Sequence, residues 1–222
     1  MESALSLSRQ ARFKIFSENI SQAIEDEGLV VRPYTHPTLP YFNLLSTEEQ
    51  EQVLKDLLIY YQICMDMKHQ GDSLKDTRKF TERAISRLNK RADPKVMDLL
   101  RPDHLVEIYN TNHTQIFRSL PYFEVCTYSL EDIYCRKWYH LYERSPEDQE
   151  QLDKDLGLFY AHSPLRTIEV HAPEHIIRET GSLERMEILT KIWWLSPLFS
   201  TNKEDTYIMA VETSRLPEMA VR

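Results

Sequence analysis

Apolar residues in the first half of the chain recur every three or four positions, which is the period of an α-helix with one buried face. This period predicts five helices, at residues 9–26, 46–70, 73–91, 93–100 and 102–108. The second helix begins with Ser46 and Glu49, whose spacing is that of a capping box. The fourth begins with Asp93 and Pro94, a good N-cap and first-turn pair. Residues 1–110 are therefore expected to be nearly all helical.

The period changes in the second half of the chain. Residues 122–128 are rich in aromatic and β-branched side chains, which predicts a strand. Ser129 then caps a helix that runs to Tyr142, and Ser145 with Pro146 opens another. Apolar and other residues alternate over residues 186–194, the period of a β-strand. Further strands are expected at residues 166–171, 176–179 and 206–211.

These elements predict an α+β fold. A helical N-terminal region, residues 1–110, precedes a small antiparallel sheet with helices on one face, residues 111–222. The 222 residues can form one large domain or two small ones. We place the boundary between Pro102 and Pro121.

Composition narrows the classes of function. The formal net charge of -8 and the pI near 5.5 disfavour binding to nucleic acid. The four glycines argue against a glycine-rich phosphate-binding loop. The three cysteines form no C-x-x-C pair, and free thiols are typical of a reducing cytoplasm. No segment has the length and apolarity of a signal peptide or a membrane span, so we expect a cytoplasmic protein without a membrane partner.

Three late segments and one helical segment resemble the PAS sensor domain. The sequence SLEDIYCRKWYHLYERSPEDQEQL is similar to the early helical part of that fold. The segments RTIEVHAPEHIIRE, RMEILTKIWWLSPLF and DTYIMAVET are similar to its last three strands. The resemblance covers residues 112–215 and rests on element order. It implies a sensing or docking module in which a ligand or partner lies between the inner sheet face and the helices, and in which flanking helices transmit the signal.

Seven residues of the second half are candidates for the lining of such a pocket, because the pattern places them on inward faces. They are Tyr134, Trp138, Ile168, Val170, Ile188, Ile192 and Trp194. Adjacent residues on a strand point to opposite faces, so Trp193 and Trp194 are expected to separate, with one of them in the core.

No residue set has the pattern of a catalytic or metal site. Cys135 lacks the neighbours of the reactive cysteine of flavin-binding PAS light sensors, and we interpret it as an ordinary buried or half-buried thiol. His171 and His175 are four apart but lie on a broken strand without a third ligand. A haem sensor would need His140 or His162 in the pocket. The sequence thus does not indicate a cofactor.

One local excess of positive charge lies in the third predicted helix, between Lys75 and Arg91. It could contact nucleic acid or an acidic partner, but a solvated helix face is the favoured interpretation.

The expected function is non-catalytic sensing or regulation through a small ligand, a protein partner or a homodimer. Two alternatives stay open: a docking protein acting through its helical half, and a small enzyme that uses a histidine–carboxylate pair in a cavity. The sequence does not indicate the ligand, the oligomeric state or the signalling output.

Overall fold

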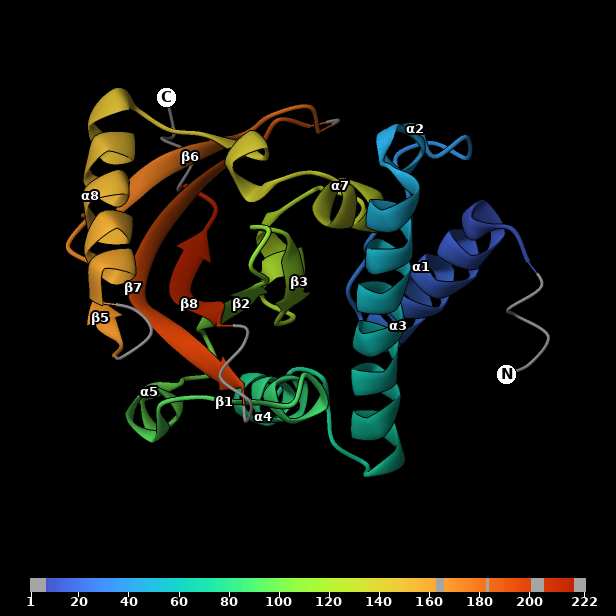
Figure 1. The fold of residues 1–222 in the computed structure, drawn as a ribbon, viewed down its shortest axis with the longest axis horizontal. Coiled ribbons are helices and arrows are strands. Elements are labelled where there is room, and N and C mark those ends of the chain that lie inside the picture. Colours follow the sequence, from blue (N-terminus) through green and yellow to red (C-terminus); the bar gives the residue numbers. More distant parts are fainter. Residues whose placement is uncertain (1–6, 163–165, 183, 201–205, 218–222) are drawn as a thin grey trace.

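The chain has the α+β fold expected from its sequence (Figure 1). The structure, a computed structural model, describes residues 7–162, 166–182, 184–200 and 206–217. The N-terminal helices are α1 (Arg9–Glu25), α2 (Pro40–Leu44), α3 (Thr47–His69), α4 (Thr77–Arg87) and α5 (Pro94–Leu99). The later helices are α6 (Tyr122–Val125), α7 (Leu130–Cys135), the 3-10 helix η2 (Trp138–His140) and α8 (Pro146–His162).

A curled antiparallel sheet joins early and late parts of the chain. Its strands are β1 (Lys90–Arg91), β2 (Leu105–Tyr109), β3 (Gln115–Arg118), β4 (Tyr142–Glu143), β5 (Ile168–Glu169), β6 (His175–Glu179), β7 (Glu187–Ser200) and β8 (Tyr207–Arg215). Their order is β3-β2-β8-β7-β6-β4, and the short strands β1 and β5 also pair with β7. The last strand thus lies inside the sheet, between β2 and β7.

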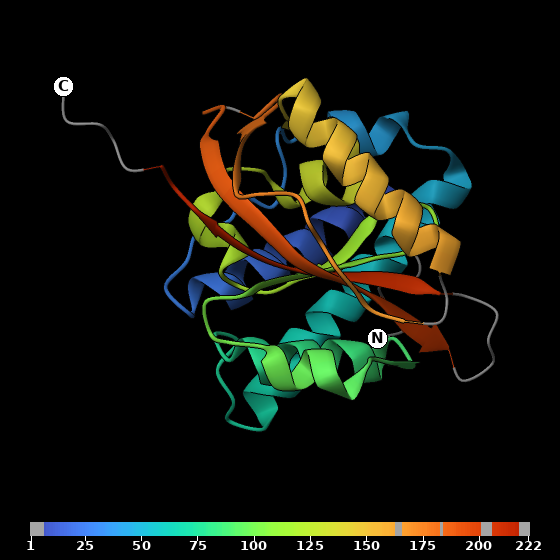
Figure 2. The same cartoon turned by 90° about the vertical axis from the view of Figure 1, so that its left-hand side faces the viewer.

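Helices cover both faces of this sheet. Helix α8 crosses one face in front of β7 and β8 (Figure 2), where Leu152 and Phe159 of α8 pack with Ile192 of β7. Helices α1 and α3 lie on the other face, and α4 and α5 lie along the lower end of the sheet (Figures 1 and 2). There Phe117 of β3 packs edge-on against Phe80 of α4, with ring centroids 5.0 Å apart.

The prediction of a fifth helix near Pro102 was wrong, because residues 105–109 form strand β2. All but the last residue of this strand are buried, and β2 has neighbours on both edges. A short apolar run that is buried on both faces loses the alternation of a half-buried strand. Its pattern alone therefore cannot distinguish it from a helix.

The strand expected at residues 122–128 was also wrong. Pro121 opens the short helix α6, and both Tyr122 and Phe123 are buried. Aromatic content favoured a strand, but a helical turn places both rings in the core. The capping box on the next helix is present, between Ser129 and Asp132.

Helix α7 ends at Cys135, seven residues before the expected end. Arg136 leaves the helix with extended backbone angles, φ -117° and ψ 151°. Its guanidinium donates to the carbonyl oxygen of Thr180 at 2.9 Å and lies 5.5 Å from the ring centre of Tyr128. A tertiary contact therefore ends this helix, where local propensity would have continued it.

Strands β7 and β8 are longer than their patterns indicated. β7 continues through Pro197 to Ser200, and β8 continues to Arg215. The pairing of β7 with β8 contains a bulge at Trp193, which interrupts the alternation of side chains. The rings of Trp193 and Trp194 consequently lie 6.2 Å apart, and do not separate to opposite faces as expected.

The expected division at residue 110 stays a prediction. It falls just after β2, a strand that pairs with β8 near the other end of the chain. One hydrophobic core also extends from Phe13 of α1 to Val211 of β8. Among the described residues, no helix combines the length and the apolarity that crossing a membrane requires.

Candidate functional site

A partly enclosed cavity of about 120 Å³ lies on the face of the sheet that α8 crosses. Strands β2, β3, β6, β7 and β8 form its floor. Its walls come from α6, η2, residues 141–144 and α8. Apolar side chains make up most of the lining, including Leu105, Leu156, Ile177, Leu195, Ile208 and Ala210.

A smaller set of polar side chains converges on the same cavity. It consists of Glu107, Tyr109, His113, Gln115, Tyr122, Tyr142, Arg144, Tyr160, Glu212 and Ser214. An apolar cavity with a few convergent polar groups is the usual form of a small-molecule site.

Three of the seven predicted pocket residues line this cavity: Trp138, Ile188 and Ile192. Ile192 faces it because strand alternation places it in phase with Ile188. The indole of Trp138 lies in the wall, with its ring centre 6.4 Å from that of Tyr109.

The other four predicted residues lie elsewhere. Ile168 and Val170 belong to the small hydrophobic cluster beneath α8. Tyr134 is buried in the main core, where its hydroxyl donates to the carbonyl oxygen of Ile116 at 3.3 Å. Trp194 packs against His104, with ring centres 5.7 Å apart.

The charged residues of the cavity were not predicted from the sequence pattern. Glu107 lies in a run of apolar residues that was assigned to a helix. Glu212 alternates in phase with Ile208 and Ala210 on β8, so a charge on the inward face was a detectable signal. Arg144 lies between β4 and α8, where no periodic pattern exists.

Glu107 is buried at the floor of the cavity and is held by its neighbours. Its carboxylate accepts hydrogen bonds from the hydroxyl of Tyr109 and the amide of Gln115. Burial raises the pKa of Glu107, while the Tyr109 hydrogen bond and the positive charge of Arg118 oppose the increase.

Arg118 is fully buried behind Glu107. Its guanidinium carbon lies 5.1 Å from the ring centre of Tyr122 and 5.2 Å from that of Tyr134, so two aromatic faces stabilise the cation. Its Nη2 donates to the carbonyl oxygen of Gln115 at 3.2 Å. The Nε and Nη1 atoms find no hydrogen-bond partner among the described residues.

Glu212 is the second carboxyl group of the cavity. Burial raises its pKa well above the ordinary value, and the negative charge of Glu107 raises it further. Arg144 and a weak 3.5 Å contact from the Ser214 hydroxyl oppose the increase. Glu107 and Glu212 therefore disfavour each other's ionisation, as two carboxyl groups that share one site do.

Glu212→Gln is expected to increase the free energy of unfolding at pH 8 by about 1–3 kcal/mol, because it removes a carboxylate that is costly to ionise in the folded state. A raised pKa destabilises the fold as pH rises through the unfolded value toward the folded one, so the gain should vanish below pH 4. Urea unfolding at both pH values measures the difference. The matched change Glu187→Gln removes an exposed carboxylate of β7 that is paired with Arg178, so it should lower stability by no more than about 1 kcal/mol at pH 8 and should give no gain. A gain that persists at pH 4 would contradict the electrostatic explanation.

No protein-family model matches the sequence, and no curated protein is significantly similar to it.

The other residues singled out from the sequence lie outside the cavity. Cys135 is a half-buried free thiol whose pKa burial raises well above the ordinary value. His140 is exposed on η2, and the side chain of His162 lies outside the described residues. His171 lies 3.5 Å from Asp155, and the buried His175 contacts the carbonyl oxygen of Pro173. The described residues contain no group of three or more potential metal ligands.

Acidic residues neutralise much of the positive charge on α4. The ammonium of Lys79 lies 2.6 Å from Asp72, and Arg87 forms an ion pair with Asp66. Arg78 bridges Glu82 and Asp98. This arrangement favours the interpretation as a solvated helix face.

Proposed function

We propose that the protein is a non-catalytic sensory or regulatory module that binds a small ligand in the cavity between the sheet and α8. The observation that carries the proposal is the cavity itself, with its apolar lining and convergent Glu107, Glu212 and Arg144. Its layout agrees with the PAS resemblance, which implies a ligand between the inner sheet face and the helices.

Strands β2 and β3, which form part of the cavity floor, also contact helices α3 and α4. On β2 and β3, Glu107 and Gln115 face the cavity. The opposite face of these strands meets the helices: Phe117 of β3, which pairs with Ile108 of β2 beside a register shift, packs against Phe80 of α4. The hydroxyl of Tyr60 on α3 donates to the carbonyl oxygen of Arg118 at 2.9 Å. A ligand that shifts β2 or β3 would therefore shift α3, which gives the cavity a route to the helical half.

Such a signal requires that the ligand bind two arrangements of the molecule with different affinity. The contacts of α3 with β3 would differ between these arrangements. Hydrogen exchange of the α3 amides, with and without ligand, reports this difference.

The enzyme alternative has weaker support. His113 reaches the cavity, but its Nδ1 lies 3.4 Å from the hydroxyl of Tyr160. Among the described residues, the histidine–carboxylate pair within 4 Å is His171 with Asp155, and neither residue lines the cavity. The docking alternative stays a prediction.

Native mass spectrometry of the full chain, purified directly from a cell extract, tests the proposal. We expect a stoichiometric small molecule on the wild-type chain. The variant Ala210→Phe should lose it, because a benzyl group at this buried position fills the cavity. Ala161→Phe, the same change at an exposed position of α8, should retain it.

The melting temperature gives a second readout for a ligand lost during purification, because a bound ligand stabilises the folded state. A panel of small acids, amines and aromatic compounds should contain members that raise the melting temperature of the wild type and not that of Ala210→Phe. If no bound mass is found and no compound distinguishes the two chains, the proposed function is overturned.

A further inference from the structure

Arg144 presents an unsatisfied guanidinium to the cavity. Arg144 lies between β4 and α8. The next residue, Ser145, caps α8: its hydroxyl oxygen accepts a hydrogen bond from the backbone amide of Asp148 at 3.1 Å. The Nε and Nη1 atoms of Arg144 are buried and have no hydrogen-bond partner among the described residues. Its guanidinium carbon lies 5.7 Å from the ring centre of Trp138. The side chain is thus held against an aromatic wall, with donors left over.

The carboxyl groups of the cavity do not serve these donors. Among the described residues, no carboxylate oxygen lies within 4.0 Å of the Arg144 guanidinium. Glu107 already accepts from Tyr109 and Gln115. Glu212 accepts a long contact from the Ser214 hydroxyl, at 3.5 Å. The charge of Arg144 therefore interacts electrostatically with both carboxyl groups, but its guanidinium forms a hydrogen bond with neither among the described residues.

Buried guanidinium donors without acceptors lower the stability of a folded protein, and buried charges are normally paired with good geometry. The planar fork of arginine matches a carboxylate, which can accept two parallel hydrogen bonds. The missing partner of Arg144 is accordingly an acceptor that the chain itself does not supply.

The remaining cavity limits the size and charge of this partner. Its volume of about 120 Å³ is close to the roughly 150 Å³ of an apolar cavity that admits benzene. Trp138 lies against Arg144, and most of the remaining lining is apolar. Two carboxyl groups face the same space, and they would repel a ligand with several negative charges. One negative charge on a compact apolar body is what fits.

We propose that the cavity binds a small monocarboxylic acid, about the size of benzoate, whose carboxylate pairs with Arg144 and whose apolar body packs on Trp138 and Ile192. This inference rests on the proposed function and specifies the ligand class of the same site. Glu212, whose neutral form is favoured by burial beside Glu107, would be able to donate a hydrogen bond to the bound carboxylate. The carboxyl, guanidinium and imidazole groups that face the ligand are then those of Glu107, Glu212, Arg144 and His113, and tyrosine hydroxyl groups line the same space.

Calorimetric titration of the full chain with three probes of one size tests the inference. The probes are sodium benzoate, neutral benzamide and the cation benzamidinium. Benzoate should bind at least about tenfold more tightly than the other two, which is the order expected for a charge-assisted pair. Arg144→Met should weaken benzoate at least about tenfold and leave benzamide unchanged. Arg178→Met, which removes an exposed arginine paired with Glu187, should leave all three affinities within about twofold.

Arg144→Lys provides a second variant if the methionine variant does not fold. It retains the charge and loses the planar fork, so it should bind benzoate more weakly than the wild type. Equal binding of benzoate and benzamide, or unchanged benzoate affinity in the Arg144 variants, would overturn the inference. If benzamide or benzamidinium binds and Ala210→Phe abolishes that binding, the cavity remains a ligand site and only the carboxylate class is wrong. If none of the probes binds, the inference is also overturned, while the extract experiment still decides the proposed function.

Discussion

Replacing Asp56 by asparagine is expected to increase the free energy of unfolding at pH 8 by up to about 4 kcal/mol. Asp56 lies on α3 and is 4% exposed. Its Oδ1 accepts from Gln52 at 2.9 Å, and its Oδ2 has no hydrogen-bond partner among the described residues. Burial raises the pKa of Asp56 from 3.8 to about 7. A shift of about 3 units corresponds to roughly 4 kcal/mol between the two protonation states.

The destabilisation caused by Asp56 depends on pH. Below pH 3.8 the carboxyl group is protonated in both folded and unfolded chains, so Asp56 costs nothing. Between pH 3.8 and 7 only the folded chain retains the proton, and stability falls as pH rises. Above pH 7 the full cost is present. Asparagine has no such cost, so the variant should gain over the wild type across this window.

Urea unfolding of both chains at pH 4, 6 and 8, followed by circular dichroism, measures the effect. Asp66→Asn is the matched control on the same helix, because Asp66 is paired with Arg87 near the surface. Loss of that exposed pair should cost no more than about 1 kcal/mol. A constant difference between Asp56→Asn and the wild type at all three pH values would contradict the prediction.

Replacing Glu131 by alanine is expected to destabilise the protein by about 3–5 kcal/mol. Glu131 lies in the first turn of α7 and is fully buried. Its carboxylate accepts from the backbone amides of Thr35 at 3.1 Å, Tyr41 at 2.8 Å and Phe42 at 3.2 Å. Alanine would leave three amides without this acceptor, and each such loss costs about 1–3 kcal/mol when the amide is buried.

The loss of stability should be large because Glu131 caps the N-terminus of α2, which has no side-chain cap from its own segment. Leu39, the N-cap residue of α2, has a left-handed backbone and provides no side-chain hydrogen bond. The amides at the start of α2 therefore depend on a carboxylate some 90 residues away. Loss of Glu131 would release α2 from α7, two helices that pack together.

Denaturant unfolding at pH 7 measures this loss. Glu131→Gln keeps one acceptor oxygen and should give an intermediate stability. Glu124→Ala, at an exposed position of α6, should change stability by less than about 0.5 kcal/mol. Equal effects of the alanine changes at positions 131 and 124 would show that the contacts of α2 do not depend on Glu131.

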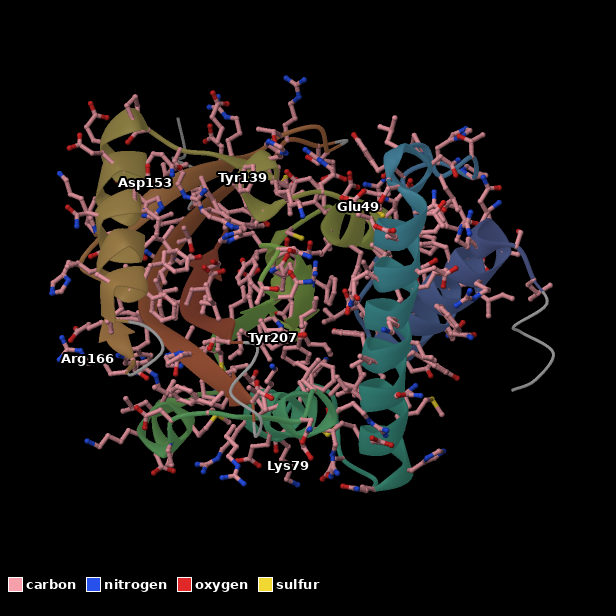
Figure 3. All side chains as sticks on the ribbon, in the orientation of Figure 1. Glu49, Lys79, Tyr139, Asp153, Arg166 and Tyr207 are labelled. Carbon is pink, nitrogen blue, oxygen red and sulfur yellow. The ribbon has the colours of Figure 1, made fainter. Side chains whose placement is uncertain are left out.

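Side chains in Figure 3 show how local and distant interactions combine in this fold. Glu49 lies on α3 near α7, and its carboxylate accepts from the backbone amide of Ser46 at 2.9 Å. This capping box was predicted from four consecutive residues. Asp153, on the exposed side of α8, likewise accepts from Gln149, one helical turn earlier. Neither contact depends on the rest of the molecule.

Local sequence therefore determined the helices that have an apolar stripe and a cap. Helices α1, α3, α5 and α8 begin where Ser8, Ser46, Asp93 and Ser145 accept hydrogen bonds from the first turn. These interactions span three or four residues, so the pattern contains all the information that they need. The alternation that predicted β7 is local in the same sense.

Tertiary structure decided the elements and the site that depend on distant partners. β2 is a strand because β3 and β8 satisfy its backbone on both edges, and its own residues fit either state. α7 ends at Cys135 because Arg136 finds the carbonyl of Thr180. Pairing across about a hundred residues also brings Glu107 and Glu212 to one concave face. No local pattern predicts that these two residues lie close together, because the interactions that bring them together form only when β2 pairs with β8 in the folded sheet.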